Sequence, residues 1–122
     1  MLNEKTRFYG RTKKIDIEVL KNVFNSDRFV YIDIVLLFGS RAVGSYHERS
    51  DYDFAVLADE GENRSWGTLS SIWNDIGSSL KLDEVDYDVV DLREATDEMK
   101  KSIKKGYVIL KGENDDISRI LG

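Results

Sequence analysis

The chain has 122 residues, of which 41% are hydrophobic and 34% charged, a composition typical of one soluble globular domain. It contains no cysteine and one histidine, which excludes disulfides, thiolate metal sites and a zinc site built from several histidines. The net charge of −5 argues against nucleic acid as the main partner, because nucleic-acid-binding domains usually carry a basic face.

The first part of the chain predicts a helix followed by a buried strand. Residues 1–14 are basic and polar, and we expect them at the periphery of the domain. From Asp16, an N-cap residue, apolar side chains recur at helical spacing as far as about Asn25. The segment from Tyr31 to Phe38 is almost continuously apolar, as in a strand that is buried on both faces. We therefore expect this strand at the centre of a sheet.

A polar connection, a second strand and a long helix are predicted next. The connection from Arg41 to Ser50 has room for a helical turn and a loop, and the strand from Tyr52 to Leu57 alternates in polarity at its start. After an acidic loop, Ser65 is a good N-cap for a helix that ends near Leu80. The apolar face of this helix consists of Trp66, Leu69, Ile72, Trp73, Ile76 and Leu80. Its two tryptophans belong either to the core or to a protein interface.

The remainder predicts a strand from Val85 to Leu92, a helix capped by Thr96, and a short strand from Tyr107 to Leu110. Residues 113–122 form a tail with a small apolar stripe, which we expect at the periphery, docked on the body or on a partner. The order of elements predicts an α/β (α+β) fold in one domain, 1–122, with a mixed sheet of about four strands backed by helices in two layers. No apolar run reaches the roughly 20 residues of a membrane span, and the N-terminus lacks the apolar core of a secretory signal, so we expect a cytoplasmic protein.

The most informative motif joins the first two strands. An apolar strand ends in Gly39-Ser40, ten residues follow, and Asp51-Tyr52-Asp53 opens the second strand. Side chains two apart on a strand share a face, so the two carboxylates point to one spot and repel each other unless a cation lies between them. Hard oxygen ligands of this kind suit magnesium, and a glycine-serine corner directs N–H groups and a hydroxyl toward an anion. The pattern predicts a metal-triphosphate site, the alternative being aspartates that merely cap a loop.

Three further residues lie in the connection. Arg41 follows the Gly-Ser corner directly and Arg49 precedes the first aspartate, so each is either a phosphate ligand or a solvated loop arginine. His47 is interpreted as a surface loop residue, because nothing nearby orients it as a Ser-His-Asp triad would require.

The spacing of Gly39-Ser40, ten residues and Asp51-x-Asp53 resembles the signature of the nucleotidyltransferase superfamily that includes DNA polymerase β. The resemblance is strongest to its short, single-domain members, the minimal nucleotidyltransferases, and covers about Ile32 to Leu110. It implies a polymerase β-like fold in which Gly39 and Ser40 hold the triphosphate of ATP. It also implies that Asp51 and Asp53 bind two Mg²⁺ ions.

The resemblance also implies a third carboxylate on the third predicted strand. A family pattern such as Asp-Leu-Val-Asp-Leu aligns with Asp88-Val89-Val90-Asp91-Leu92, which makes Asp88 the third catalytic and metal-binding acid. Asp86 shares the face of Asp88 and is the alternative, whereas Asp91 points the other way.

Minimal nucleotidyltransferases are commonly paired with a helical HEPN protein as antitoxin and toxin. The resemblance therefore implies a protein adenylyltransferase that moves AMP from ATP to a hydroxyl of a HEPN partner. One alternative is a nucleotide-binding, non-catalytic antitoxin that acts by occluding its partner. Another is a small-molecule, aminoglycoside-type nucleotidyltransferase, which the short chain disfavours. Whether the protein forms a homo- or hetero-oligomer stays open.

Overall fold

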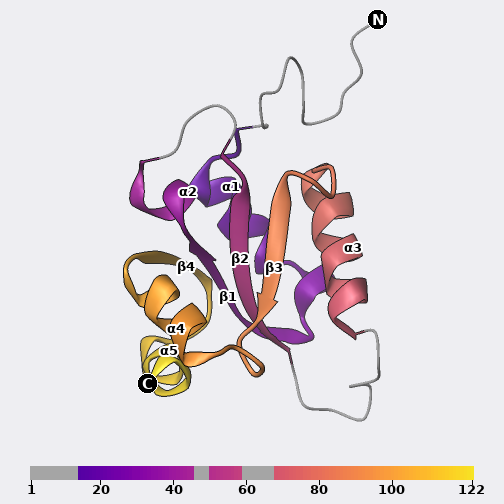
Figure 1. Cartoon of the computed structure of the whole chain (residues 1–122). Coiled ribbons are helices and arrows are strands. Elements are labelled where there is room, and N and C mark those ends of the chain that lie inside the picture. Colours follow the sequence, from indigo (N-terminus) through magenta and orange to yellow (C-terminus); the bar gives the residue numbers. More distant parts are fainter. Residues whose placement is uncertain (1–13, 46–49, 59–67) are drawn as a thin grey trace, which may run out of the picture.

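The fold is built on a four-stranded mixed sheet in the order β3-β2-β1-β4. The computed structural model (Figure 1) describes residues 14–45, 50–58 and 68–122. Strand β1 (Ile32–Phe38) runs antiparallel to both β2 (Tyr52–Ala58) and β4 (Tyr107–Lys111), whereas β2 runs parallel to β3 (Tyr87–Asp91). The prediction of a mixed sheet of about four strands is thus confirmed, and β1 has a partner on each side as expected for a central strand.

Helices connect the strands in the described part of the chain. They are α1 (Ile17–Phe24), the 3₁₀-helix η1 (Asp27–Phe29), α2 (Ser40–Val43), α3 (Thr68–Leu80), α4 (Asp97–Lys104) and α5 (Asn114–Leu121). The side chain of Thr96 caps α4 by accepting a hydrogen bond from the N–H of Met99 at 3.1 Å, as predicted. Residues 1–13, and the predicted helix start at Ser65 and Trp66, lie outside the described residues.

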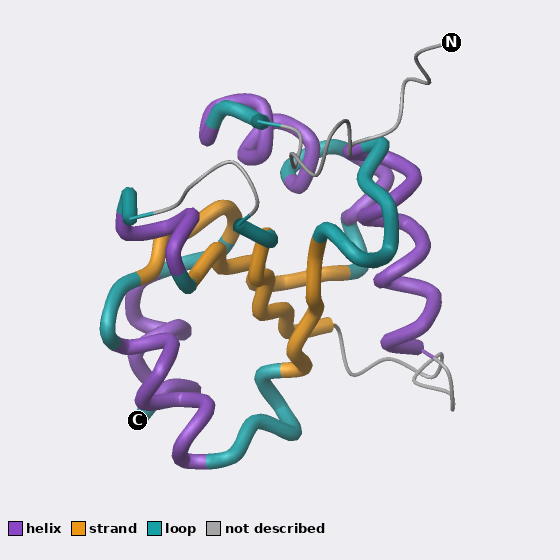
Figure 2. Tube along the Cα trace, turned by 45° about the horizontal axis from the view of Figure 1, so that its top comes forward, coloured by secondary structure: helices purple, strands orange, loops and turns teal. Residues whose placement is uncertain are grey.

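Helices cover both faces of the sheet (Figure 2). The apolar sides of α1 and α3 pack on the face that carries Val35 and Leu37 of β1. Helices α4 and α5 pack on the opposite face, against Leu36 and Phe38. The expected two-layer arrangement therefore needs correction, because the short apolar stripes of α4 and α5 form a second core beneath the sheet.

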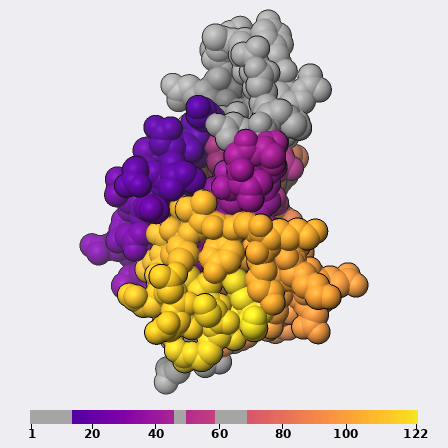
Figure 3. Space-filling view, turned by 90° about the vertical axis from the view of Figure 1, so that its left-hand side faces the viewer, coloured from indigo at the N-terminus to yellow at the C-terminus, as the bar shows by residue number. Residues whose placement is uncertain are grey.

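The C-terminal tail docks on the body of the protein. Ile117 and Leu121 of α5 are buried in the second core together with Ile103 of α4. Figure 3 shows α4 and α5, in orange and yellow, as one continuous surface next to α2, in magenta. Of the two alternatives for the tail, docking on the body is the one that the structure supports, because its apolar stripe faces the sheet.

The third strand is shorter than predicted. It begins at Tyr87, and Val85 is 60% exposed in the preceding turn. This turn is closed by a 2.9 Å hydrogen bond from the N–H of Asp86 to the carbonyl of Asp83, which keeps Val85 out of the sheet. No helix in the described ranges is long and apolar enough to cross a membrane.

Candidate active site

One end of the sheet gathers the residues of the motif, because β1 ends where β2 and β3 begin (Figure 1, top). Asp53 of β2 lies opposite Phe38 of β1 on one side and opposite Asp88 of β3 on the other. Residues in register on adjacent strands project to the same face. The fold therefore brings the second aspartate of the motif and the predicted third acid side by side.

Gly39 closes this end of the sheet against Asp53. Its backbone adopts φ +76° and ψ −162°, a conformation that side-chain-bearing residues avoid. A Cβ atom at this position would also overlap the carboxylate of Asp53. Glycine is therefore required both for the backbone conformation and for the lack of a side chain. Because it has no Cβ, the Gly39-Ser40 corner can lie directly against the carboxylate of Asp53.

The carboxylate of Asp53 is the electrostatic centre of the site. Burial, together with the smaller effects of the negative charges of Asp88 and Asp51, raises its pKa from the ordinary value of 3.8 to about 6. Two neighbouring carboxylates thus act on Asp53 together, as the alternation along β2 and the pairing with β3 predict. A bound cation would reverse this repulsion, so the donor set fits a hard divalent ion.

Asp88 and Asp86 have different surroundings. Asp88 is exposed on the edge strand β3, where its Oδ1 accepts a 2.9 Å hydrogen bond from the N–H of Val89. Asp86 is fully buried before the strand begins, and its backbone carbonyl accepts a 3.0 Å hydrogen bond from the N–H of Tyr52. The geometry favours Asp88 as the third acid, because Asp88 and not Asp86 is in register with Asp53.

In the part of the chain that the structure describes, the acidic side chains are not arranged as a complete metal site. Within the described residues, no group of three or more Asp, Glu, His or Cys side chains is placed so that it could hold a metal ion. The hydrogen bond to Val89 turns Asp88 toward the backbone of its own strand.

The two predicted arginines have different outcomes. Arg41 is 8% exposed, and its Nε donates a 3.1 Å hydrogen bond to the carbonyl of Ser50. Its guanidinium lies over the ring of Tyr52, 4.7 Å from the ring centroid. Arg49, like His47, lies outside the described residues, so its assignment stays a prediction.

Sequence reasoning missed the apolar wall beside the acids. Phe38 is in register with Asp53 on one side and with Tyr107 of β4 on the other, so the three residues form a row across the sheet. Phe38 is buried and Tyr107 half-buried on the face of the second core. The position of Phe38 directly before Gly39 could have indicated in the sequence that Phe38 lies beside the site. Tyr107 joins the row only through the pairing of β1 with β4, which the sequence does not show.

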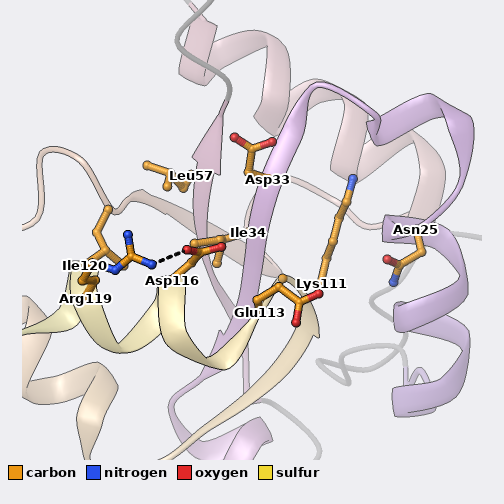
Figure 4. A pocket seen from close by; sticks show the side chains of 10 residues that line it. Asn25, Asp33, Ile34, Leu57, Lys111, Glu113, Asp116, Arg119 and Ile120 are labelled. Atoms are coloured by element: carbon orange, nitrogen blue, oxygen red, sulfur yellow. Dashed lines mark hydrogen bonds and ion pairs between the residues drawn. The ribbon is translucent and has the colours of Figure 1, made fainter.

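A separate hollow lies at the other end of the sheet (Figure 4). It has a volume of about 740 Å³ and is lined by Asp33 at the start of β1 and Lys111 at the end of β4. The Nζ of Lys111 donates to the carbonyl of Phe29 at 2.8 Å, and Arg119 pairs with Asp116 at 2.8 Å across its rim. None of the predicted site residues that the structure describes lines this hollow.

Comparison with known proteins places this arrangement in a family. The profile described as "Polymerase beta, Nucleotidyltransferase" matches residues 15–116. The chain belongs to this family. The match covers both halves of the motif and the third acid, so the predicted family membership and polymerase β-like fold are confirmed.

Known proteins resemble this chain either over a short stretch at high identity or over most of its length at low identity. The protein adenylyltransferase MntA of Aphanizomenon flos-aquae (strain 2012/KM1/D3) is 57% identical over 30 residues, which are 25% of this chain and 20% of that relative. A crystal structure of a toxin-antitoxin with AMP-PNP superposes with a TM-score of 0.64 and 24% identity, over 88% of this chain and 82% of the other. A structure of a tri-AMPylated Shewanella oneidensis HEPN toxin in complex with MNT antitoxin gives a TM-score of 0.58 and 22% identity, over 87% and 81%. At these identities the structural likeness shows the fold.

The raised pKa of Asp53 predicts a pH-dependent stability for this nucleotidyltransferase-family chain. The folded protein holds the Asp53 proton more tightly than the unfolded chain, so stability is lost as the pH rises from 3.8 to about 6 and stays lost above it. Asp53→Asn should therefore raise the melting temperature of the metal-free protein by a few degrees at pH 7 and have little effect near pH 4. Thermal unfolding in a chelator at both pH values tests this. The exposed Asp33 at the far end of β1 supplies a control, since Asp33→Asn should show no such difference.

Proposed function

We propose that this protein transfers AMP from ATP to a hydroxyl group of a partner protein, in a magnesium-dependent reaction. One observation carries the proposal: at one end of the sheet, Gly39 lies against the carboxylate of Asp53, and Asp88 is in register with Asp53 on the neighbouring strand. The family match over residues 15–116 supports nucleotidyl transfer as the reaction class. The AMPylated HEPN toxin of a structural relative supports a HEPN-type protein as the acceptor.

The chain's own residues divide the work of this reaction. The N–H groups at the start of a helix have no carbonyl partner within the helix, so the Gly39-Ser40 corner and the Ser40 hydroxyl would hold the terminal phosphates. Asp51 and Asp53 would bind the metal ions, and Asp88 would face the acceptor. Bound magnesium would neutralise the triphosphate and polarise the α-phosphate.

The proposed transfer step is an in-line displacement at the α-phosphorus. The acceptor oxygen forms a bond to the α-phosphorus, while the bond from that phosphorus to the bridging oxygen of the β-phosphate breaks. The electron pair of the broken bond leaves with pyrophosphate. The proton of the acceptor hydroxyl passes to the Asp88 carboxylate, which serves as general base.

Two labelled forms of ATP test the proposal directly. The protein is incubated with magnesium and its HEPN-type partner, once with ATP labelled in the α-phosphate and once with ATP labelled in the γ-phosphate. Nucleotidyl transfer should label the partner only from the α-phosphate. Label from the γ-phosphate would indicate a kinase, and a stable complex with no label would favour the non-catalytic, occluding antitoxin.

Gly39→Ala is expected to weaken nucleotide binding, whereas the same substitution at Gly44 is not. Gly39→Ala should cost about 1–3 kcal/mol of folding free energy and weaken magnesium-ATP binding, because the new Cβ displaces the Asp53 carboxylate. Gly44 also has a positive φ, +81°, but in the described ranges nothing beyond its own chain neighbours lies within 4 Å of a Cβ added there. Gly44→Ala should therefore lower stability and leave affinity unchanged. Calorimetry on the two variants separates backbone strain from the effect on the site, and equal affinities would remove the corner from the nucleotide site.

Asp88→Asn and Asp86→Asn should have different effects. Loss of a general base lowers turnover by about 10²- to 10⁴-fold, so Asp88→Asn should reduce kcat while magnesium-ATP affinity changes little. Asp86 is fully buried, so Asp86→Asn should mainly lower the melting temperature and have a smaller effect on kcat. Single-turnover kinetics below the melting point of each variant compare the two, and a larger kcat loss in Asp86→Asn would show that the wrong acid was chosen.

A further inference from the structure

Arg41 follows Gly39 and Ser40 in sequence, but its side chain leaves the face that carries the acids. The guanidinium lies over the ring of Tyr52, which packs in the core beneath α1 and α3. Asp53, the next residue, projects to the opposite face because side chains alternate along a strand. Arg41 is only 8% exposed. Its guanidinium therefore lies on the other side of the sheet from the place where the triphosphate would bind.

We propose that Arg41 is a positioning residue, which fixes the Asp51 end of β2 relative to the Gly39-Ser40 corner. The side chain begins in the first turn of α2 and its Nε donates to the carbonyl of Ser50 at 3.1 Å. The peptide that carries this carbonyl leads directly into Asp51. One side chain thus joins the two halves of the motif across nine residues of sequence. The inference rests on the proposed function, since it assigns to Asp51 the role of metal ligand.

The stacking partner of Arg41 is itself held rigidly. The N–H of Tyr52 donates to the carbonyl of Asp86 at 3.0 Å, and its Oη accepts a 2.8 Å hydrogen bond from the N–H of Ile15. The ring also stacks on Phe54, with centroids 6.1 Å apart and planes 6° apart. Tyr52 is therefore fixed at three points, and a guanidinium lying on it has a fixed position too.

Arginine suits this position better than lysine does. The guanidinium is planar, so it can lie flat on an aromatic ring while its edge donates to a carbonyl in the plane of the guanidinium itself. An ammonium group is a strongly hydrated point charge that stacks poorly and loses more on burial. If Arg41 were instead a phosphate ligand, lysine could replace it, because lysine also binds phosphate as a point charge. Arg41→Lys therefore distinguishes the two roles.

The kinetic test uses Arg41→Ala, Arg41→Lys, Tyr52→Leu and the double variant Arg41→Ala/Tyr52→Leu. A displacement of 1 Å in a reacting group can cost about 10²-fold in rate, so both Arg41 variants should lower kcat by about 10- to 100-fold. The KM for ATP should change by less than about threefold, since no ground-state contact is lost. The double variant should lose no more than the worse single variant, because both changes break the same unit. A rise in KM with unchanged kcat, restored by Arg41→Lys, would overturn the proposal.

Hydrogen exchange without nucleotide tests the same unit independently of the reaction. The Tyr52 amide should exchange faster in Arg41→Ala than in the wild type, while the amides of α4 stay unchanged. Arg119→Ala, at an exposed position of α5, loses its ion pair with Asp116; it is the control and should leave the Tyr52 amide protected. Unchanged exchange in Arg41→Ala would overturn the proposal even in an active enzyme. Faster exchange in a protein that transfers no AMP would instead reject the proposed function and leave the positioning role intact.

Discussion

Asp53→Asn is expected to abolish AMP transfer in a protein that remains folded. The substitution removes a ligand charge from the centre of the acid cluster, where Asp88 and Asp51 already act on the Asp53 carboxylate. Metal stabilisation of transition-state charge contributes several kcal/mol, so the rate should fall by about 10³-fold or more. Asp51→Asn should have an effect of the same order. The measurement is transfer of label from α-labelled ATP under single-turnover conditions.

The stability of the same variant makes this result specific. Relief of repulsion should make metal-free Asp53→Asn at least as stable as the wild type at pH 7, so lost activity cannot be attributed to unfolding. Magnesium should raise the melting temperature of the wild type and have less effect on the variant, since ligand binding stabilises only a protein that binds it. Transfer at the wild-type rate in Asp53→Asn would reject the metal assignment.

The sequence predicted those parts of the site that depend on local spacing. The alternation along the second strand is local, so the two-residue periodicity predicted that Asp51 and Asp53 act on each other, and the charge of Asp51 does raise the pKa of Asp53. The Gly-Ser corner was also local, and its requirement for glycine is visible in the positive φ of Gly39. Placing Asp88 beside Asp53 needed the family pattern as well, because parallel pairing of β2 with β3 joins segments that are separated by a whole helix.

The features that the sequence could not predict depend on tertiary contacts. The apolar stripe of the tail is equally suited to a partner and to the sheet, and only the packing of Ile117 and Leu121 decides between them. Arg41 reads as a phosphate ligand from its place after Gly-Ser, and its burial depends on a ring eleven residues away in the chain, that of Tyr52. The start of β3 was misplaced by two residues because a turn hydrogen bond of Asp86 holds Val85 out of the sheet.

Co-expression with a HEPN-type protein from the neighbouring reading frame is expected to yield a complex in which the partner carries AMP. The proposed metal-triphosphate site lies where β1 ends and β2 and β3 begin, at one end of the sheet. In the proposed reaction the partner presents its acceptor hydroxyl to this end of the sheet, in line with the leaving pyrophosphate. The apolar side of α5 faces the sheet and is not available for docking, whereas Val43, 55% exposed on α2 beside the Gly39-Ser40 corner, is a better candidate for contact.

Size-exclusion chromatography followed by intact mass measurement tests both parts of this prediction. The partner should gain the mass of one or more AMP units when it is produced with the wild type and none when it is produced with Asp53→Asn. The matched control is Asp33→Asn, which changes an equivalent charge at the opposite end of β1 and should leave the mass gain intact. Because the variant and the control bear the same substitution on neighbouring strands, a difference between them assigns the transfer to the acid cluster. A complex of unmodified partner with the wild type would mean inhibition by occlusion, and the absence of any complex would reject the pairing.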